Sequence, residues 1–401
     1  MRAHFSRRTR RSLPIGTARQ GSFAPAAILA LVVVVSGVAL VLDKLWLEAA
    51  HAELTTAVEA AALSSGKQLA SDDLLREDSA IESRLERARV QATELAARHL
   101  IAGQPVQLDA SEEGSIRFGK LVLRNDADEP LFVETTDNPT SVVVTGARTR
   151  SGNNPVALLW QGIAGIDFAD VVARAEATVD NHVVGFRALN GIPIPALPLA
   201  ILKRDLSQKH PDWETQIESR LGQDLWRYDA VTHQPVEEKD GIPEIVLKTV
   251  APNGKPEDAN VQIFALDRTT NFTELDEHLK LGWNIADFHE SEPELRLDRG
   301  PQEFLRIDPN GGNVATALEK LIGECRIVLL YDQLHDGNVR CVGAVAGRIL
   351  QLTRGENGVC QMVFQPGVLT TRTAILPQET LVPLTHELAA NRYIYKLQLT
   401  Y

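Results

Sequence analysis

Residues 23–42 read Phe-Ala-Pro-Ala-Ala-Ile-Leu-Ala-Leu-Val-Val-Val-Val-Ser-Gly-Val-Ala-Leu-Val-Leu, and this run sets the plan of the chain. It contains no charged side chain, and a helix of this length rises about 30 Å, the thickness of the hydrocarbon core of a bilayer. Six arginines and no acid precede it, whereas Asp43, Lys44 and Glu48 follow. The arginine excess favours a cytoplasmic N-terminus. The sequence therefore predicts a single-pass protein of the cytoplasmic (inner) membrane with an extracytoplasmic C-terminal region.

This prediction divides the chain into four parts: a cytoplasmic basic tail (residues 1–21), a transmembrane helix (22–42), a helical stalk (43–101) and an extracytoplasmic α+β region (102–401). A subdivision of the last part near residue 270 stays open. A cleaved signal peptide is the rival interpretation, because Ala50-His51-Ala52 has the small residues of a cleavage site. The apolar run exceeds the 7–15 residues typical of a signal peptide, which favours an uncleaved signal-anchor.

The charge balance restricts the partners. All 53 acidic residues follow the apolar run, and six of the 41 basic ones precede it, so residues 43–401 carry a net charge of −18 (35 positive against 53 negative). Nucleic-acid binding needs a basic face, so this class is excluded. The three cysteines, Cys325, Cys341 and Cys360, allow either one disulfide with one thiol left over or three small buried residues without a bridge.

The predicted stalk is a pair of helical stretches. Residues 45–64 are alanine-rich and lack proline, and Ser64-Ser65-Gly66 suggests a break after them. A second helix is expected over residues 72–101, with an apolar stripe that includes Leu74, Ile81 and Leu85. The face opposite this stripe is expected to be solvated and rich in ion pairs. It carries Glu82, Arg84, Glu86, Arg87 and Arg89.

Beyond residue 105 the pattern changes to short β-type runs separated by turn residues, which predicts a mostly antiparallel α+β fold with a few helices. The expected strands are 115–123, 131–135, 141–145, 156–160, 171–184, 244–250, 261–266, 325–331, 342–352 and 360–365. The expected helices are 205–221, 273–281 and 313–323, the last with Asn313 as its N-cap and Gly323 at its C-cap.

A search for chemistry assigns no catalytic residue, no cofactor site and no metal site. The P-loop, the dinucleotide-binding fingerprint, the nucleophile elbow and the zinc-protease motif are all absent. Asp332, His335 and Asp336 could be imagined as an acid–base or metal cluster, but Asp336-Gly337-Asn338 is a hairpin-turn signature. Residues 308–313 lack the ligand spacing of a calcium loop. Asn271-Phe-Thr is a glycosylation sequon by spelling.

Several segments resemble, in order, the TadG-like family of Tad (Flp-type) pilus-assembly proteins. That family pattern is a basic leader with a glycine, a membrane segment ending in aspartate, an alanine-rich helix and two later strands. The corresponding segments here are Arg19-Gln-Gly-Ser-Phe-Ala-Pro-Ala, Ala39-Leu-Val-Leu-Asp43, Ala57-Val-Glu-Ala-Ala-Ala-Leu63, Pro155-Val-Ala-Leu-Leu-Trp-Gln-Gly and Asp170-Val-Val-Ala-Arg-Ala-Glu-Ala-Thr-Val. Residues 197–200 and the strand that begins at Val342 fit the same pattern.

The chain also departs from this family. Glu59 stands where aspartate is more common, and the Asp-x-Ser-x-Ser metal loop of members with a von Willebrand A-type domain is absent. The fifth residue after Gly21 is Ala26, whereas prepilins have glutamate there. The resemblance implies a non-enzymatic, membrane-anchored accessory protein of pilus assembly or secretion. Its expected partners are membrane lipid along residues 23–42 and pilins or pilus-assembly proteins. A tethered ligand-binding or sensory module and an anchored hydrolase remain the alternatives.

Overall fold

The computed structural model describes residues 23–400 apart from residue 79 and the segments 123–129, 161–165, 251–253, 267–271, 289–292, 308–313, 356–358 and 378–389. The chain divides into two compact units. The first unit consists of Met1–Ala50 and Arg148–Val171, and the second consists of His51–Ala147 and Val172–Tyr401. The expected basic tail over residues 1–21 lies outside the described residues.

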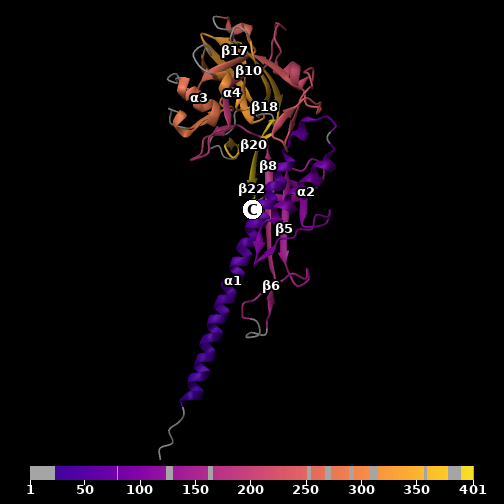
Figure 1. Cartoon of the computed structure of the whole chain (residues 1–401), viewed down its shortest axis with the longest axis vertical. Coiled ribbons are helices and arrows are strands. Elements are labelled where there is room, and N and C mark those ends of the chain that lie inside the picture. The colour runs from indigo at the N-terminus through magenta and orange to yellow at the C-terminus, as the bar shows by residue number, and fades with distance from the viewer. Residues whose placement is uncertain are drawn as a thin grey trace, which may run out of the picture. The chain divides into compact units, whose positions relative to one another are not determined.

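One helix, α1 (Ala24–Leu69, 46 residues), contains both the apolar run and the alanine-rich stretch that follows it (Figure 1). The predicted break at Ser64-Ser65-Gly66 is wrong, because the helix continues through these residues. Ser65 is fully buried, and a Cβ atom added at Gly66 would lie 2.9 Å from Cδ1 of Leu397. Packing against a sheet therefore maintains a helix that serine and glycine alone would weaken.

That sheet has six strands in the order β20-β22-β8-β5-β3-β4. The second half of α1 packs on it through a stripe of small and apolar side chains that are 0% exposed, including Leu54, Val58 and Ala61. Gly146 permits the close approach, since an added Cβ would lie 2.6 Å from Val58 and 2.8 Å from Leu54. The strands are β3 (Ile116–Val122), β4 (Leu131–Glu134), β5 (Ser141–Arg148), β8 (Val171–Asp180), β20 (Leu369–Thr370) and β22 (Ile394–Leu399).

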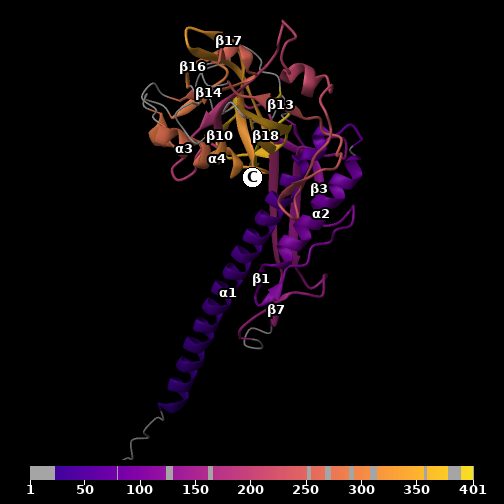
Figure 2. The same cartoon turned by 45° about the horizontal axis from the view of Figure 1, so that its top comes forward.

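The predicted second helix is shorter than expected. The chain forms a 3₁₀ turn, η1 (Asp72–Leu75), and only then the helix α2 (Ile81–Ala97), which packs against β3 (Figure 2). The expectation that Arg84 and Arg89 are solvated is also wrong, because they are 5% and 8% exposed. The Arg89 guanidinium lies 5.2 Å from the centroid of the Phe118 ring, so a cation–π contact compensates part of its burial.

The larger sheet of the second unit closes on itself. Its order is β13-β19-β18-β16-β14-β10-β17, and β17 pairs again with β18, so β18, β16, β14, β10 and β17 form a barrel. Every neighbouring pair in it is antiparallel except β10 with β17. The bounds are β10 (Ala196–Leu202), β13 (Ile245–Lys248), β14 (Val261–Ala265), β16 (Gln302–Ile307), β17 (Cys325–His335), β18 (Asn338–Arg354) and β19 (Cys360–Pro366). The α+β, antiparallel-rich prediction is confirmed.

The helices α3 (Phe272–Leu281) and α4 (Val314–Glu319) pack against β10 and β18, respectively. The predicted helix over residues 205–221 is wrong: this stretch has a single π-helical turn, η2 (Glu214–Glu218). The Asp205 carboxylate accepts backbone N–H bonds at 2.8 Å from Ser207, Lys209 and His210, which fixes a turn instead of a helix.

The remaining elements are short. They are β1 (Leu100–Ile101), β2 (Gln104–Pro105), β6 (Val156–Ala157), β7 (Phe168–Ala169), β9 (Gly185–Arg187), β11 (Arg227–Asp229), β12 (Gln234–Val236), β15 (Glu294–Arg296), β21 (Ala374–Ile375), η3 (Pro256–Asp258) and η4 (Ile285–Asp287). The core of the second unit is centred on the barrel. Its largest fully buried side chains include Trp213, Trp283 and Phe264.

Candidate functional site: the two ends of the long helix

The first half of α1 presents its apolar side chains outward. The large apolar side chains from Phe23 to Leu42 are between 39% and 89% exposed. Among the described residues, α1 is the one helix long and apolar enough to cross a membrane, and a signal sequence would meet the same test. Exposed apolar surface on this scale marks a surface that something outside the chain covers.

A buried stripe on the same segment interrupts this exposure. Ala39 and Ala50 are 2% exposed and Asp43 is 9% exposed, although their neighbours on α1 are exposed. The carboxylate oxygen Oδ1 of Asp43 accepts the backbone N–H groups of Leu159 at 2.8 Å and Trp160 at 3.2 Å. A carboxylate that holds two backbone donors is a strong, charge-assisted acceptor. Asp43 therefore fixes the segment after β6 to α1.

A second polar contact holds the same hairpin one turn further along the helix. The indole Nε1 of Trp46 donates to the carbonyl oxygen of Ala157, at the end of β6, at 3.1 Å. The hairpin is braced from its own side as well. The backbone N–H of Arg150 donates to the Asp170 carboxylate at 2.9 Å, and its guanidinium donates to the carbonyl oxygen of Phe168. The base of the β6–β7 hairpin is thus rigid and polar.

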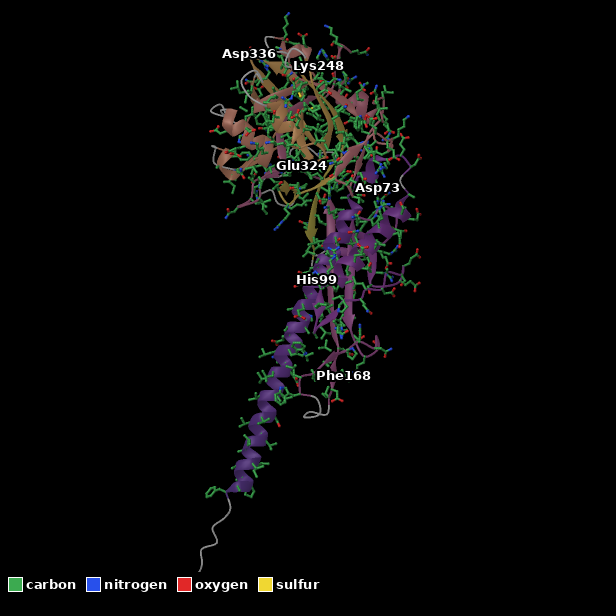
Figure 3. All side chains as sticks on the ribbon, viewed as in Figure 1. Asp73, His99, Phe168, Lys248, Glu324 and Asp336 are labelled. Atoms are coloured by element: carbon green, nitrogen blue, oxygen red, sulfur yellow. The ribbon has the colours of Figure 1, made fainter. Side chains whose placement is uncertain are left out.

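The hairpin also carries exposed apolar side chains on its two arms, before residue 161 and after residue 165. Leu159, Trp160, Ile166 and Phe168 are 57%, 41%, 50% and 42% exposed, and we call these four side chains the hairpin tip. Figure 3 shows Phe168 on this hairpin. Exposed aromatic and aliphatic side chains on a braced hairpin are candidates for contact with a surface outside the chain.

The other end of α1 leads into an ion-pair cluster in the second unit. The Asp72 carboxylate accepts a bond from the Arg348 guanidinium at 2.7 Å and one from the backbone N–H of Val368 at 2.6 Å. The Arg348 guanidinium also lies 4.5 Å from the centroid of the Tyr228 ring. Burial opposes the charge of Arg348, but Asp72, together with Cys325 and Tyr228, outweighs this effect and raises the pKa of the guanidinium. Asp72 thus joins η1 to β18 of the barrel.

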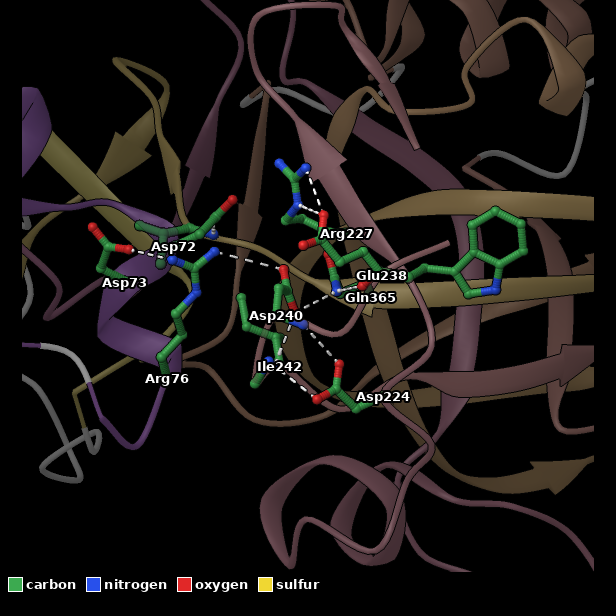
Figure 4. Close-up of polar contacts among 12 residues, drawn as sticks. Asp72, Asp73, Arg76, Asp224, Arg227, Glu238, Asp240, Ile242 and Gln365 are labelled. Carbon is green, nitrogen blue, oxygen red and sulfur yellow. Dashed lines mark hydrogen bonds and ion pairs between the residues drawn. The ribbon is translucent and has the colours of Figure 1, made fainter. Parts of the chain in front are cut away.

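Arg76 extends the cluster towards a second group of acids (Figure 4). Its guanidinium pairs with Asp73 at 2.8 Å and with Asp240 at 3.7 Å. Asp240 in turn accepts bonds from the backbone N–H of Ile242 at 3.0 Å and from Nε2 of Gln365 at 3.2 Å. Burial raises the pKa of the Asp240 carboxyl, and Arg76 only partly offsets this effect.

Glu244 is the most strongly perturbed carboxyl beside this cluster. It is 3% exposed, and it accepts backbone N–H bonds from Trp226 at 2.6 Å and from Leu225 at 3.2 Å. Burial raises the pKa of Glu244 to about 7, against the opposing effect of these bonds, and the nearby charges of Asp224 and Asp240 add to the rise. Because this buried acid titrates near neutral pH, we expect the free energy of unfolding of the second unit to depend on pH.

The residues weighed for chemistry from the sequence lie at the hairpin that joins β17 to β18. β17 ends at His335, Asp336 (φ 48°) and Gly337 (φ 79°) make the turn, and β18 begins at Asn338, so the hairpin prediction is confirmed. Within the described residues, His, Cys, Asp and Glu side chains do not gather in threes at metal-binding distance. Residues 308–313 and Asn271 lie outside the described residues.

All three cysteines are free thiols, which decides between the two possibilities left open by the sequence. Burial raises the pKa of Cys325 to about 12 and that of Cys360 to about 11, and it raises that of Cys341 as well. Thiols whose pKa is raised in this way are poor nucleophiles. The cysteines therefore serve as packing residues, Cys325 and Cys341 in strands of the barrel and Cys360 in β19, which pairs with β18.

Sequence reasoning found Asp43 and residues 155–160 only as parts of a resemblance, and it missed their contact. The two segments are more than a hundred residues apart, so no local periodicity could reveal that they meet. The one available signal was Asp43 itself, a charge placed directly after an apolar run. In comparisons with known proteins, no family model matches this chain, and no curated protein or solved structure matches it either.

Proposed function

We propose that this protein is a membrane-anchored, non-enzymatic accessory protein of Tad/Flp-type pilus assembly or secretion. Residues 1–21 would be cytoplasmic, and the chain from Asp43 onward would be extracytoplasmic and would contact pilins or pilus-assembly proteins. The observation that carries the proposal is the contrast along α1. Its first half leaves its apolar side chains uncovered, and its second half is packed onto a sheet of the same chain.

The uncovered half suits lateral contact with other helices. Small residues let helix backbones approach closely within a bilayer. Ala26, Ala30 and Gly37 are exposed, and a Cβ atom added at Gly37 would meet nothing within 4 Å. Ala39 is also small, but it is 2% exposed and is unavailable. Gly37 is therefore the position where bulk would block a partner without disturbing this chain.

A second observation concerns the segments that carry the family resemblance. Asp43 ends the apolar run and residues 155–160 form the later strand motif, and these two segments are hydrogen-bonded to each other. A shared contact gives a physical reason why one protein would keep both segments.

The decisive experiment is an affinity pull-down of tagged full-length protein from gently solubilised membranes, after crosslinking in its native cells, read by mass spectrometry. We expect pilins or a secretion ATPase complex among the captured proteins. Gly37→Leu should lower this capture and the number of surface pili at least tenfold, since it fills a close helix contact worth about 1.4 kcal/mol or more. Val33→Leu is the matched control, because Val33 is already large and is 64% exposed.

Two results would contradict the proposal. One is normal piliation in a strain from which the gene has been deleted. The other is a capture that contains no pilus or secretion component although the protein is present in the membrane fraction. A ligand-dependent rise in the melting temperature of the purified protein would then favour the tethered binding module.

A further inference from the structure

The position of the β6–β7 hairpin along α1 has a consequence for the membrane. Asp43, which holds the hairpin, follows Leu42, the last residue of the apolar run. A residue advances a helix by about 1.5 Å, so Asp43 lies within about 2 Å of the end of this run along the helix axis. If the run fills the hydrocarbon core, the hairpin lies at the depth of the headgroup layer, which is roughly 5–8 Å thick.

The buried residues on α1 place the hairpin at the same depth in the bilayer. Ala39 belongs to the apolar run and lies one helical turn before Asp43, yet it is 2% exposed, like Ala50. The covered part of α1 in the first unit therefore begins inside the apolar run. The hairpin also combines polar and apolar groups: Arg150 and Asp170 brace its base, and the side chains of the hairpin tip are exposed and apolar.

The side chains of the hairpin tip are of the kind found at a membrane–water interface. Tryptophan is enriched at the membrane–water interface, because its large apolar ring carries a polar N–H group. Phe168 adds a purely apolar ring on the other arm of the hairpin. Leu159 and Ile166, at 57% and 50% exposure, add aliphatic surface that water alone would not stabilise.

We infer that the hairpin tip (Leu159, Trp160, Ile166 and Phe168) inserts into the phospholipid interface of the leaflet on the Asp43 side of the membrane. The bound surface is the boundary between headgroups and acyl chains, and the binding is hydrophobic rather than headgroup-specific. This inference rests on the proposed anchoring by α1. It adds a second membrane contact, which fixes the rotation of α1 about its own axis at the membrane surface.

The test uses tryptophan emission of the full-length protein in phosphatidylcholine nanodiscs, with and without lipid brominated near the carbonyl end of its acyl chains. Bromine quenches only tryptophans at that depth. The chain has five tryptophans, and Trp46 and Trp160 are the two in the first unit. We expect Trp160→Phe to lower the lipid-quenchable emission by about half, because Trp46 is the other tryptophan at interface depth. Trp226→Phe, in the second unit, should leave it unchanged.

The outcomes separate this inference from the anchoring on which it rests. If the protein does not co-elute with the nanodiscs, the anchoring itself fails. If it co-elutes but Trp160→Phe leaves the quenchable emission unchanged, the anchoring stands and the lipid-bound hairpin is wrong. A blue-shifted but unquenched Trp160 would mean that a protein surface, such as a second copy of the chain, covers the tip, and it would overturn the inference too. Phe168→Asp offers a second variant, because a charge at this position opposes insertion and should lower the lipid-quenchable emission of Trp160; unchanged emission would contradict the inference.

Discussion

The two halves of α1 are parts of one helix, but they differ in how their apolar surface is covered. The first half is rich in large aliphatic side chains, and these are exposed. The second half is richer in alanine, and its inward stripe is 0% exposed against a sheet of its own chain. Burial along this helix therefore follows the surface that the chain itself supplies and not hydrophobicity, because the more apolar half is the exposed one.

The largest test of this contrast truncates one leucine in each half. Leu54→Ala removes a side chain that is 0% exposed and packed over Gly146, so it should lower the free energy of unfolding of the second unit by about 3 kcal/mol. Leu31→Ala removes a side chain that is 63% exposed and should change that free energy by less than about 0.5 kcal/mol. Urea unfolding in detergent, followed by near-UV circular dichroism, measures both. Equal losses would contradict the contrast.

A second test uses the dependence of stability on pH. It targets Glu244, which lies beyond the second half of α1 in the sequence. The pKa of Glu244 rises from 4.5 to about 7 on folding, so the folded protein binds the extra proton between these values. The contribution of Glu244 to stability is therefore full below about pH 4.5 and is lost as the pH rises towards 7, by an amount on the order of 2 to 3 kcal/mol.

Glu244→Gln isolates this effect, because glutamine is neutral at every pH and keeps an oxygen that can accept the N–H of Trp226. The unfolding free energy of the wild type, minus that of the variant, should fall between pH 4.5 and pH 8. Matched denaturation curves at several pH values measure this difference. A difference that stays constant over this range would show that Glu244 is not protonated in the folded protein.

The smallest test compares Asp43, which holds the β6–β7 hairpin, with Asp72, which pairs with Arg348 of β18. Asp72→Asn removes the negative charge beside the buried Arg348 and should destabilise the second unit by about 2 kcal/mol. Asp43→Asn should leave that unit unchanged. It replaces a charged acceptor with a neutral one, so the amides of Leu159 and Trp160 should exchange faster with deuterium.

Hydrogen–deuterium exchange of both variants in nanodiscs reads the two effects in one experiment. Faster exchange throughout the barrel in Asp43→Asn would mean that the hairpin supports the whole protein. Unchanged exchange at residues 159 and 160 would mean that Asp43 does not hold the hairpin.

The sequence predicted the parts of this fold that depend on local pattern. The apolar run, most of the expected strands and the Asp336-Gly337 turn are recognisable because length, β-branched residues and turn chemistry act over a few residues. Failures occurred where distant groups compete with local propensity. Burial against Leu397 keeps α1 helical at Gly66, and the side chain of Asp205 replaces a helix with a turn.

The candidate site could be predicted even less. Asp43 was conspicuous as a charge after an apolar run, but its partners Leu159 and Trp160 are distant in sequence. The raised pKa of Glu244 depends on burial and on two other acids, Asp224 and Asp240, which no spacing rule brings together. Barrel closure through the parallel pair β10–β17 is likewise a contact between distant segments.

The place of β22 in the sheet has a consequence for biosynthesis. This strand lies beside β8 and contributes Leu397 to the surface under Gly66, but the ribosome makes it after every strand of the barrel. Translation proceeds at about 5–20 residues per second, so the second half of α1 is synthesised many seconds before its covering is complete. During that interval the inward stripe of this half lacks the part of its covering that Leu397 supplies.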